Sequence, residues 1–360
     1  MAQFNVGIAG VGIGKEHIEA YRQLPELFTV TAVTAATPTK AQKTAAAYQI
    51  PHPVANFNAL CARDDIDIIN ICTPNHLHLP QALQALAAGK HVVIEKPVAG
   101  SLADLDRLMQ AEAASGKCVM PIFQYRFGHG LQKLKALQAA GLTGKAYLTT
   151  VETLWRRRAD YYARPWRGKW NTEMGGVLVT LAVHAHDMLC YVVGPPQRVM
   201  ARLKTAVNPI ETEDTAAATL EMADGSLATL AVTTGSSKEI SRHRFCFENL
   251  TAESSTGPYT NSADPWQFYG DTPELQAQIE AVLANFRPLP ERFAGQFYHF
   301  HRSLTQNTGL PVTLADARQS VELLTALYYA ARTETDVTLP ITPDHPLYHG
   351  WQPQTQDRSR

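Results

Sequence analysis

The sequence predicts a two-domain α/β protein in which a doubly wound parallel sheet precedes a mixed domain built on a mostly antiparallel sheet. In the first third of the chain, short β-rich runs alternate with helical stretches, and such repeated units form parallel sheets through right-handed crossovers. After Gln124 this rhythm changes, and consecutive strand-like runs follow one another. The 360 residues suffice for two domains of ordinary size, which we place at 1–123 and 124–360.

The first domain is predicted from strand-like runs with helical stretches between them. The run over 66–71 contains four isoleucines in six residues, a pattern that favours a parallel strand buried on both faces. Ser101 is placed to cap the helix that follows it. The expected strands are Phe4–Ala9, Thr29–Ala35, Ile66–Ile71, His91–Ile94 and Cys118–Phe123, and the expected helices are Lys15–Leu24, Thr39–Tyr48, His76–Ala88 and Ser101–Ser115.

The second domain is predicted to contain a sheet with helices on either side of it in the sequence. Asp224-Gly225 lies between two strand-like runs and predicts a hairpin turn. The expected strands are Lys145–Leu154, Arg198–Thr205, Ala216–Met222, Leu227–Thr233 and His243–Phe247, and the expected helices are Gly130–Ala140, Gly176–Val193, Pro273–Asn285, Glu291–Thr305 and Leu314–Ala331.

Composition narrows the classes of function. The formal net charge of −1 gives no electrostatic basis for binding nucleic acid or an anionic membrane. We expect no apolar run of membrane-spanning length. The five cysteines are scattered and form no CxxC pair, a pattern typical of free thiols in a reducing cytoplasm. We therefore expect a soluble cytoplasmic protein without disulfides.

A glycine-rich turn follows the first expected strand. Gly10, Gly12 and Gly14, with Val11 and Ile13 between them, lead directly into a helix. Glycines at this junction let the backbone approach a pyrophosphate, to which the helix N-terminal amides donate hydrogen bonds. The spacing is GxGxG, not GxGxxG, so a tight turn without a ligand is the alternative. Its position at the first strand–helix junction favours a dinucleotide site.

The end of the second expected strand bears on the choice between NAD and NADP. A domain that binds NAD usually has Asp or Glu there to hold the ribose hydroxyl, and this sequence has none. Thr37 and Lys40 could bind a 2′-phosphate, which favours NADP slightly. The alternative is a pocket that accepts either cofactor, with Lys40 a solvated helix residue.

Several segments resemble the Gfo/Idh/MocA family, the relatives of glucose-fructose oxidoreductase and inositol dehydrogenase. They are CTPNHLH from Cys72, AAGKHVVIEKP from Ala87, WRGKW from Trp166, GGVLVTLAVHAHDM from Gly175 and LPITPDHPLYHGW from Leu339. The resemblance implies an N-terminal Rossmann domain and a C-terminal α/β domain with an open-faced sheet. It also implies a homodimer or homotetramer. The implied activity is NAD(P)-dependent hydride transfer to or from a secondary alcohol of a sugar, sugar derivative or cyclitol.

Lys96 and His184 match the family's catalytic positions. An ammonium at Lys96 can bind a substrate hydroxyl and the cofactor, and can stabilise a developing alkoxide. The resemblance also implies a cis Lys96–Pro97 bond. Histidine titrates near neutral pH, so His184 is the expected acid/base. The family often has an aspartate four residues earlier, where this chain has Thr180, and that difference puts the usual Asp–His pairing in doubt.

Other residues are expected to bind substrate or cofactor. Asp187 shares a helix face with His184, and either orients the site or forms an ordinary ion pair. Arg126 either reaches the substrate or forms a salt bridge. Trp166 and Arg167 lie in an aromatic, basic loop that suits a sugar or a subunit contact. By resemblance, the cofactor is bound by Thr73, Pro74, Asn75, His76, Glu95 and Lys96, in addition to Gly10, Gly12, Ile13 and Gly14.

Two other classes of function stay open. Some relatives use bound NAD(P) for a redox-neutral elimination and act as glycosidases, and others sense NAD(P) without catalysis. His76 and His78, like His184 and His186, have a His-x-His spacing, but this spacing is common and no acidic partner completes a metal site. No metal is therefore expected.

Overall fold

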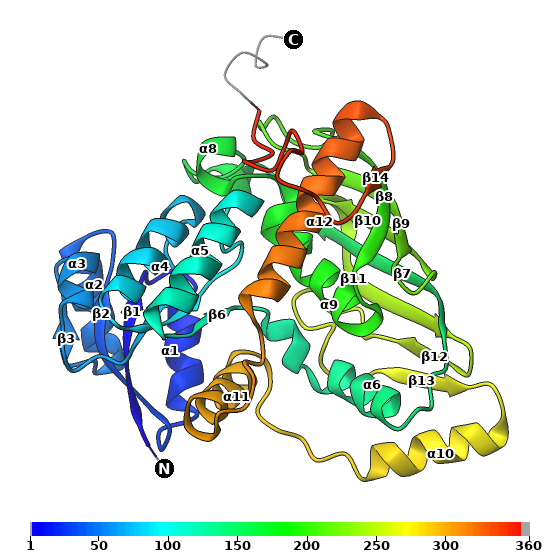
Figure 1. Cartoon of the computed structure of the whole chain (residues 1–360), viewed down its shortest axis with the longest axis horizontal. Coiled ribbons are helices and arrows are strands. Elements are labelled where there is room, and N and C mark those ends of the chain that lie inside the picture. The colour runs from blue at the N-terminus through cyan, green and yellow to red at the C-terminus, as the bar shows by residue number, and fades with distance from the viewer. Residues whose placement is uncertain (1, 354–360) are drawn as a thin grey trace. The chain divides into compact units, whose positions relative to one another are not determined.

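The structure, a computed structural model, describes residues 2–353 and divides the chain into two compact units (Figure 1). Of the described residues, the first unit comprises 2–123 and Arg292–Arg318, and the second comprises Gln124–Glu291 and 319–353. This division is less simple than the expected 1–123 and 124–360, because residues 292–318 return to the first unit.

The first unit contains a six-stranded parallel sheet with the order β3-β2-β1-β4-β5-β6. The predicted doubly wound parallel sheet is confirmed, and the strand order reverses between β1 and β4, the place where such sheets bind ligands. The strands are β1 (Phe4–Ala9), β2 (Phe28–Thr34), β3 (His52–Pro53), β4 (Ile68–Ile71), β5 (His91–Ile94) and β6 (Val119–Pro121).

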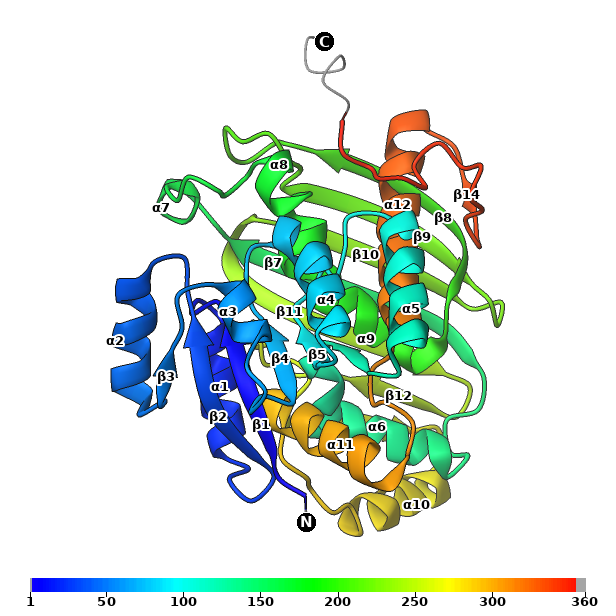
Figure 2. The same ribbon diagram turned by 60° about the vertical axis from the view of Figure 1, so that its left-hand side comes forward.

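Helices cover both faces of this sheet, with α1 and α11 on one face and α4 and α5 on the other (Figures 1 and 2). Ser101 caps α5 as predicted, since its hydroxyl accepts a hydrogen bond from the Asp104 N–H at 3.1 Å. The helices are α1 (Gly14–Arg22), α2 (Pro38–Tyr48), α3 (Phe57–Cys61), the 3₁₀ turn η1 (Asn75–Leu77), α4 (His78–Ala87), α5 (Leu102–Ser115) and α11 (Arg292–Gln306).

Helix α11 belongs to the first unit because its aromatic face packs on α1. The Phe297 ring stacks on the Tyr21 ring with centroids 4.1 Å apart, and Phe293 lies 4.4 Å from the His17 ring. Gln296 binds the end of β6 through both amide atoms: it accepts from the Phe123 N–H at 3.2 Å and donates to the Pro121 carbonyl at 2.6 Å.

The second unit contains an eight-stranded sheet with the order β13-β12-β11-β7-β10-β9-β8-β14. All neighbours pair antiparallel except β7 and β10, so the predicted mostly antiparallel sheet is confirmed. Gly225, with φ of 85°, forms the predicted hairpin turn. The strands are β7 (Ala146–Arg156), β8 (Pro196–Lys204), β9 (Thr215–Met222), β10 (Leu227–Thr233), β11 (Gly235–Phe247), β12 (Leu250–Glu253), β13 (Gln267–Gly270) and β14 (Val337–Thr338).

One prediction for the second unit is corrected. The single α-helix expected over Gly176–Val193 begins with a π-helical turn, and a wider turn of this kind often marks a functional site. The helical elements are the 3₁₀ turn η2 (Gln124–Phe127), α6 (His129–Ala139), α7 (Ala159–Tyr162), α8 (Trp170–Glu173), the π turn η3 (Leu178–Ala182), α9 (Val183–Val193), α10 (Pro273–Ala284) and α12 (Leu314–Thr333), whose first residues belong to the first unit.

The expectation that no apolar stretch reaches membrane-spanning length is also corrected. The stretch Trp170–Val193 is long and apolar enough by length and composition, with a mean hydropathy of 1.6. Of its most apolar window, 78% is buried inside the protein. Because the core helix of a soluble protein passes the same test, this stretch is weak support for a membrane span.

Candidate active site

The glycine turn after β1 has the shape that a pyrophosphate site requires. A Cβ atom on Gly10 would lie 2.4 Å from the Cys72 carbonyl oxygen, so only glycine fits there, and its φ of 96° also favours glycine. A Cβ on Gly12 would meet nothing within 4 Å, so the backbone there is open to a ligand. A Cβ on Gly14 would crowd Ile8 at 3.2 Å. The three glycines thus provide the turn, the open approach and the close helix–strand packing of a dinucleotide site.

The residues proposed for the adenosine end of the cofactor lie just beyond β2. The Thr37 hydroxyl caps α2 by accepting from the Lys40 N–H at 3.3 Å, and the Lys40 side chain is exposed. The Thr34 hydroxyl is buried at the end of β2 and has no hydrogen-bond partner among the described residues. Hydroxyl groups and an ammonium thus lie near the end of β2, and these donors suit either the ribose hydroxyl of NAD or the 2′-phosphate of NADP.

Two loops meet at the carboxyl edge between β4 and β5. His78 is fully buried and lies within hydrogen-bond distance of two carbonyl oxygens, that of Thr73 at 2.8 Å and that of Pro97 at 2.7 Å. The Lys96–Pro97 bond is cis, as the resemblance implied. His78 therefore holds the loop after β4 against the loop that carries Lys96.

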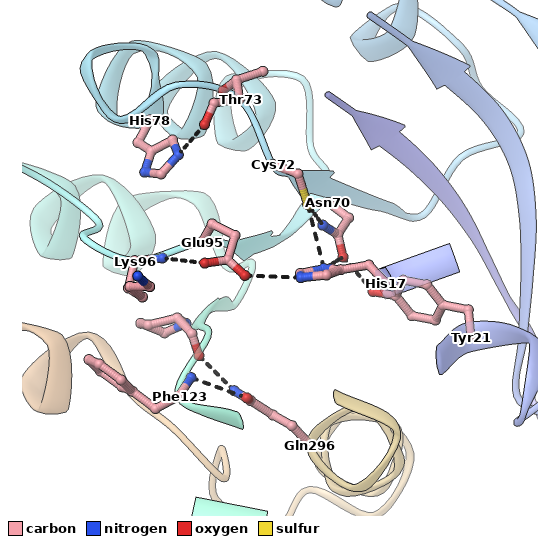
Figure 3. Close-up of polar contacts among 11 residues, drawn as sticks. His17, Tyr21, Asn70, Cys72, Thr73, His78, Glu95, Lys96, Phe123 and Gln296 are labelled. Atoms are coloured by element: carbon pink, nitrogen blue, oxygen red, sulfur yellow. Dashed lines mark hydrogen bonds and ion pairs between the residues drawn. The ribbon is translucent and has the colours of Figure 1, made fainter. Parts of the chain in front are cut away.

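A buried polar cluster lies behind Lys96 (Figure 3). The His17 ring from α1 contacts Glu95 Oε1 at 3.0 Å through Nε2 and Asn70 Oδ1 at 3.1 Å through Nδ1. The other carboxylate oxygen of Glu95 accepts a hydrogen bond from the Lys96 backbone N–H at 3.1 Å. His17, Asn70 and Glu95 are all buried. The backbone at Lys96 is thus fixed by a carboxylate that is itself held from behind.

Electrostatics make the His17–Glu95 contact an ion pair. Burial opposes a charge on His17, but interactions with Cys72 and Glu95 outweigh it and hold the pKa of His17 well above its usual value. Burial likewise opposes the charge on Glu95, but His17 and Lys96 hold the pKa of this carboxyl below its usual value. Each charge therefore stabilises the other in an interior that would otherwise disfavour both.

The remaining residues proposed for the cofactor lie along the loop after β4. Pro74 and His76 are exposed, while Thr73 and Asn75 are half-buried, and the Thr73 hydroxyl donates to Gln81 Oε1 at 2.6 Å. Ile13 is also exposed, at the start of α1. Their contacts with a cofactor stay predictions.

In the second unit, His184 lies in the first turn of α9 and is 7% exposed. Its ring stacks on the Tyr125 ring, with centroids 4.6 Å apart and planes at 14°. The Thr180 hydroxyl donates to the Gly176 carbonyl at 2.8 Å, within the π turn that precedes His184. Thr180 thus binds the helix backbone where an aspartate was expected from the family pattern.

Arg126 and Asp187 bind each other. Arg126 donates from Nε to Asp187 Oδ2 at 2.9 Å and from Nη2 to Asp187 Oδ1 at 2.6 Å, and both side chains are about 5% exposed or less. Of the two roles considered for each residue, the structure thus contains the ion pair, and substrate contact by either one stays a prediction. The pair joins the first residues of the second unit to α9.

The aromatic, basic loop contains both exposed and paired residues. Trp166 is 47% exposed. Arg167 donates to Glu173 Oε1 at 2.7 Å and lies 4.3 Å from the Tyr161 ring centroid. Among residues 2–353, no group of three or more His, Cys, Asp or Glu side chains is arranged to hold a metal ion.

Sequence reasoning missed His17, Asn70 and Cys72. The available signal was the α1 face that carries His17, Ile18 and Tyr21, because His17 is the one ionisable imidazole on an otherwise apolar helix surface. Its partner Glu95 lies 78 residues later in the chain, so spacing could not indicate the pair.

The glycine turn, the strand order and the carboxyl-edge cluster define a dinucleotide-binding α/β protein. Residues 4–123 match the oxidoreductase family with an NAD-binding Rossmann fold, and residues 131–249 match the GFO/IDH/MocA C-terminal domain. The chain belongs to the Gfo/Idh/MocA family of oxidoreductases, and the predicted resemblance is confirmed.

Relatives in this family have several activities. A levoglucosan dehydrogenase from Pseudarthrobacter phenanthrenivorans is 29% identical over 57% of this chain and 55% of its own length. A glycosyl hydrolase family 109 protein from Streptomyces filamentosus is 33% identical over 48% of this chain and 38% of its own length. The chain thus matches only about half or less of the length of these two curated relatives.

A solved structure covers more of the chain. The WlbA dehydrogenase from Bordetella pertussis, in complex with NADH and UDP-GlcNAcA, matches with a TM-score of 0.83 and 28% identity. The match covers 95% of this chain and 100% of that one. The likeness therefore extends over both units.

Proposed function

We propose that this protein is an NAD(P)-dependent dehydrogenase or reductase that moves a hydride between nicotinamide and a secondary alcohol or ketone of a sugar, sugar derivative or cyclitol. The observation that carries the proposal is the Lys96 loop, fixed through Glu95 and His17 at the carboxyl edge of an NAD-binding sheet. The sugar dehydrogenase among the relatives supports the substrate class. A homodimer or homotetramer in the cytoplasm is part of the same proposal.

The bound cofactor would supply the hydride transfer, and the protein would supply position and proton transfer. The turn from Gly10 to Gly14, the loop from Thr73 to His76, and Lys96 would hold it. Thr37 and Lys40 would donate hydrogen bonds to a 2′-phosphate, so we propose that NADP is used at least as well as NAD. A comparison of the two cofactors by Michaelis constants tests this preference.

Two side chains would act on the substrate hydroxyl. The Lys96 ammonium would donate a hydrogen bond to its oxygen and stabilise the negative charge that develops as the proton leaves. The His184 ring would accept that proton, since imidazole titrates near neutral pH. The stack on Tyr125 supports this role, because it fixes the plane of the ring.

The test is an assay of the full chain with NAD or NADP and a panel of sugars and cyclitols, read by the near-ultraviolet absorbance of reduced nicotinamide. We expect turnover with at least one compound. Lys96→Met should lower kcat by about 10²-fold or more, the range for lost acid–base groups. Cofactor binding should be weakened but not lost, because the glycine turn and the loop after β4 would still hold the cofactor. Lys43→Met is the matched control, because Lys43 is an exposed lysine on α2. Equal loss in both variants would contradict the assigned role of Lys96.

A glycosidase that uses bound cofactor without net redox change is the second candidate, favoured by the glycosyl hydrolase family 109 relative. Release of a sugar from a glycoside without a change in nicotinamide absorbance would identify it. Cofactor binding without either reaction would favour a sensor.

A further inference from the structure

A cavity of about 380 Å³ in the second unit is lined mainly by arginine and tyrosine. Five arginines lie within residues 156–167, although the whole chain has a formal net charge of −1. The volume is in the range of small-molecule sites. The lining residues are Arg156, Arg157, Asp160, Tyr161, Arg164 and Tyr259.

Arg157 is held in one orientation within this lining. Its guanidinium donates to Glu239 Oε1 at 2.6 Å and to the Tyr259 hydroxyl at 2.7 Å. It also lies 5.0 Å from the Trp155 ring centroid and 5.4 Å from that of Tyr161. A guanidinium held in this way loses little further freedom when it binds a carboxylate or phosphate.

The other two guanidinium groups of the lining have no carboxylate partner in the described part of the chain. Within residues 2–353, neither Arg156 nor Arg164 forms an ion pair, and both are exposed. Asp160 is the one carboxylate in the lining, and Glu239 binds Arg157. Three guanidinium groups thus face two carboxylates, and the positive balance favours an anionic ligand.

The cavity lies at the same end of the eight-stranded sheet as the start of the helical segment that carries His184. The Arg157 N–H donates to the Thr234 carbonyl, and the Thr234 N–H donates to the Asp214 carbonyl. The neighbouring residue Glu213 accepts from the Gly176 N–H at 3.0 Å. Helix α7, which contributes Asp160 and Tyr161 to the lining, and helix α8, which precedes Gly176, lie at this same end of the sheet (Figure 2).

We infer that this cavity binds the anionic group of a sugar substrate, either a carboxylate or a phosphate. The inference rests on the proposed function, because it assigns the substrate class to the same unit that carries His184. The guanidinium groups would bind the anion through charge-assisted hydrogen bonds. The rings of Tyr161 and Tyr259 would contact the C–H face of the sugar.

The test is calorimetric binding to the full chain in the presence of NADH, which cannot oxidise the probes. The probes are methyl β-D-glucuronide with a carboxylate, glucose 1-phosphate with a phosphate, and neutral methyl β-D-glucoside. We expect one of the two anions to bind about tenfold or more tightly than the neutral glucoside. Arg156→Gln combined with Arg164→Gln should remove that preference, because it leaves one of the three guanidinium groups.

The matched control is Arg202→Gln, which alters an exposed arginine on β8 outside the cavity lining. Equal affinity for all three probes, no binding of either anion, or an unchanged preference in the double variant would overturn the inference. Binding of heparin without either anionic sugar would also overturn it. Because binding is measured without turnover, these outcomes are independent of the hydride-transfer assay, which alone decides the proposed function.

Discussion

His17 is the residue on which the geometry behind Lys96 depends most. Both of its ring nitrogens face oxygen acceptors, on Asn70 and Glu95, and a protonated ring can donate to both. The raised pKa of His17 agrees with this arrangement. If the ring is removed, Glu95 becomes a buried carboxylate that has lost its ion-pair partner, and such losses are among the most destabilising single changes.

We predict that His17→Leu lowers the free energy of unfolding by about 3–5 kcal/mol, the cost of breaking a buried ion pair. Urea denaturation of both proteins measures it. His52→Leu is the control, because His52 is exposed on β3 of the same unit, and surface changes of this kind cost within about 0.5 kcal/mol.

The same residue also affects the pH dependence of stability. Folding raises the pKa of His17. The contribution of His17 to the free energy of unfolding is therefore complete below pH 6.5, its ordinary pKa, and is lost as pH rises towards the folded pKa. Above the ordinary value of 6.5, where the unfolded chain has lost this proton and the folded protein keeps it, the free energy of unfolding should fall as pH rises. The double variant His17→Gln/Glu95→Gln should lack this slope, because neither group of the pair can then titrate. Identical slopes in both proteins would contradict a charged His17.

The sequence indicated Lys96 and Glu95 as site residues, but it did not indicate that Glu95, His17 and Asn70 together position the Lys96 backbone. Lys96 lies within the local motif AAGKHVVIEKP, so a short stretch of sequence was enough to predict it as a site residue. His17, Asn70 and Glu95 come from three different elements, and the fold alone brings them together.

At the scale of elements, the start of the π turn η3 depends on Glu213. Its carboxylate accepts from the Gly176 N–H at 3.0 Å and the Leu178 N–H at 3.1 Å, and a Cβ on Gly176 would lie 1.7 Å from the Glu213 carbonyl oxygen. The helical period predicted the helix over 176–193. It could not indicate the π turn, because the acceptor comes from a loop more than thirty residues later.

At this scale, we predict that Glu213 makes the stability of the protein depend on pH. Burial raises its pKa to about 7, although the Gly176 and Leu178 amides oppose the shift. Because this pKa is raised, the contribution of Glu213 to the free energy of unfolding is complete below pH 4.5, its ordinary pKa, and is lost by about pH 7. The loss amounts to about 3 kcal/mol at 1.36 kcal/mol per pH unit.

The variant Glu213→Gln keeps an amide-binding oxygen but cannot ionise. Relative to the wild type, it should therefore gain about 3 kcal/mol of stability between about pH 5 and pH 8. Urea denaturation at the two pH values measures this difference. The control is Glu280→Gln, an exposed change on α10, which should show no such gain. If Glu213→Gln also shows no gain in stability, Glu213 is not a buried, protonated group.

At the scale of the whole molecule, the first unit is discontinuous in sequence. The alternation of strands and helices predicted the sheet and its helices up to Phe123. The sequence pattern could not show that α11 packs against this sheet. The spacing of apolar residues indicates which face of a helix is buried, but it does not indicate which surface covers that face. The contacts of Phe297 with Tyr21 and of Gln296 with the end of β6 identify that surface.

This arrangement predicts that residues 1–123 do not fold cooperatively alone, because the fragment exposes the α1 surface that Phe293 and Phe297 cover. Joining 1–123 to 292–318 should restore a cooperative unfolding transition. A Gly/Ser linker of about six residues suffices, since it spans roughly 13 Å and Gln296 already contacts Phe123. Circular dichroism during heating measures the transition. In the joined fragment, Phe297→Ala should cost about 3–5 kcal/mol, and a cooperative transition in 1–123 alone would show that α11 is dispensable for this unit.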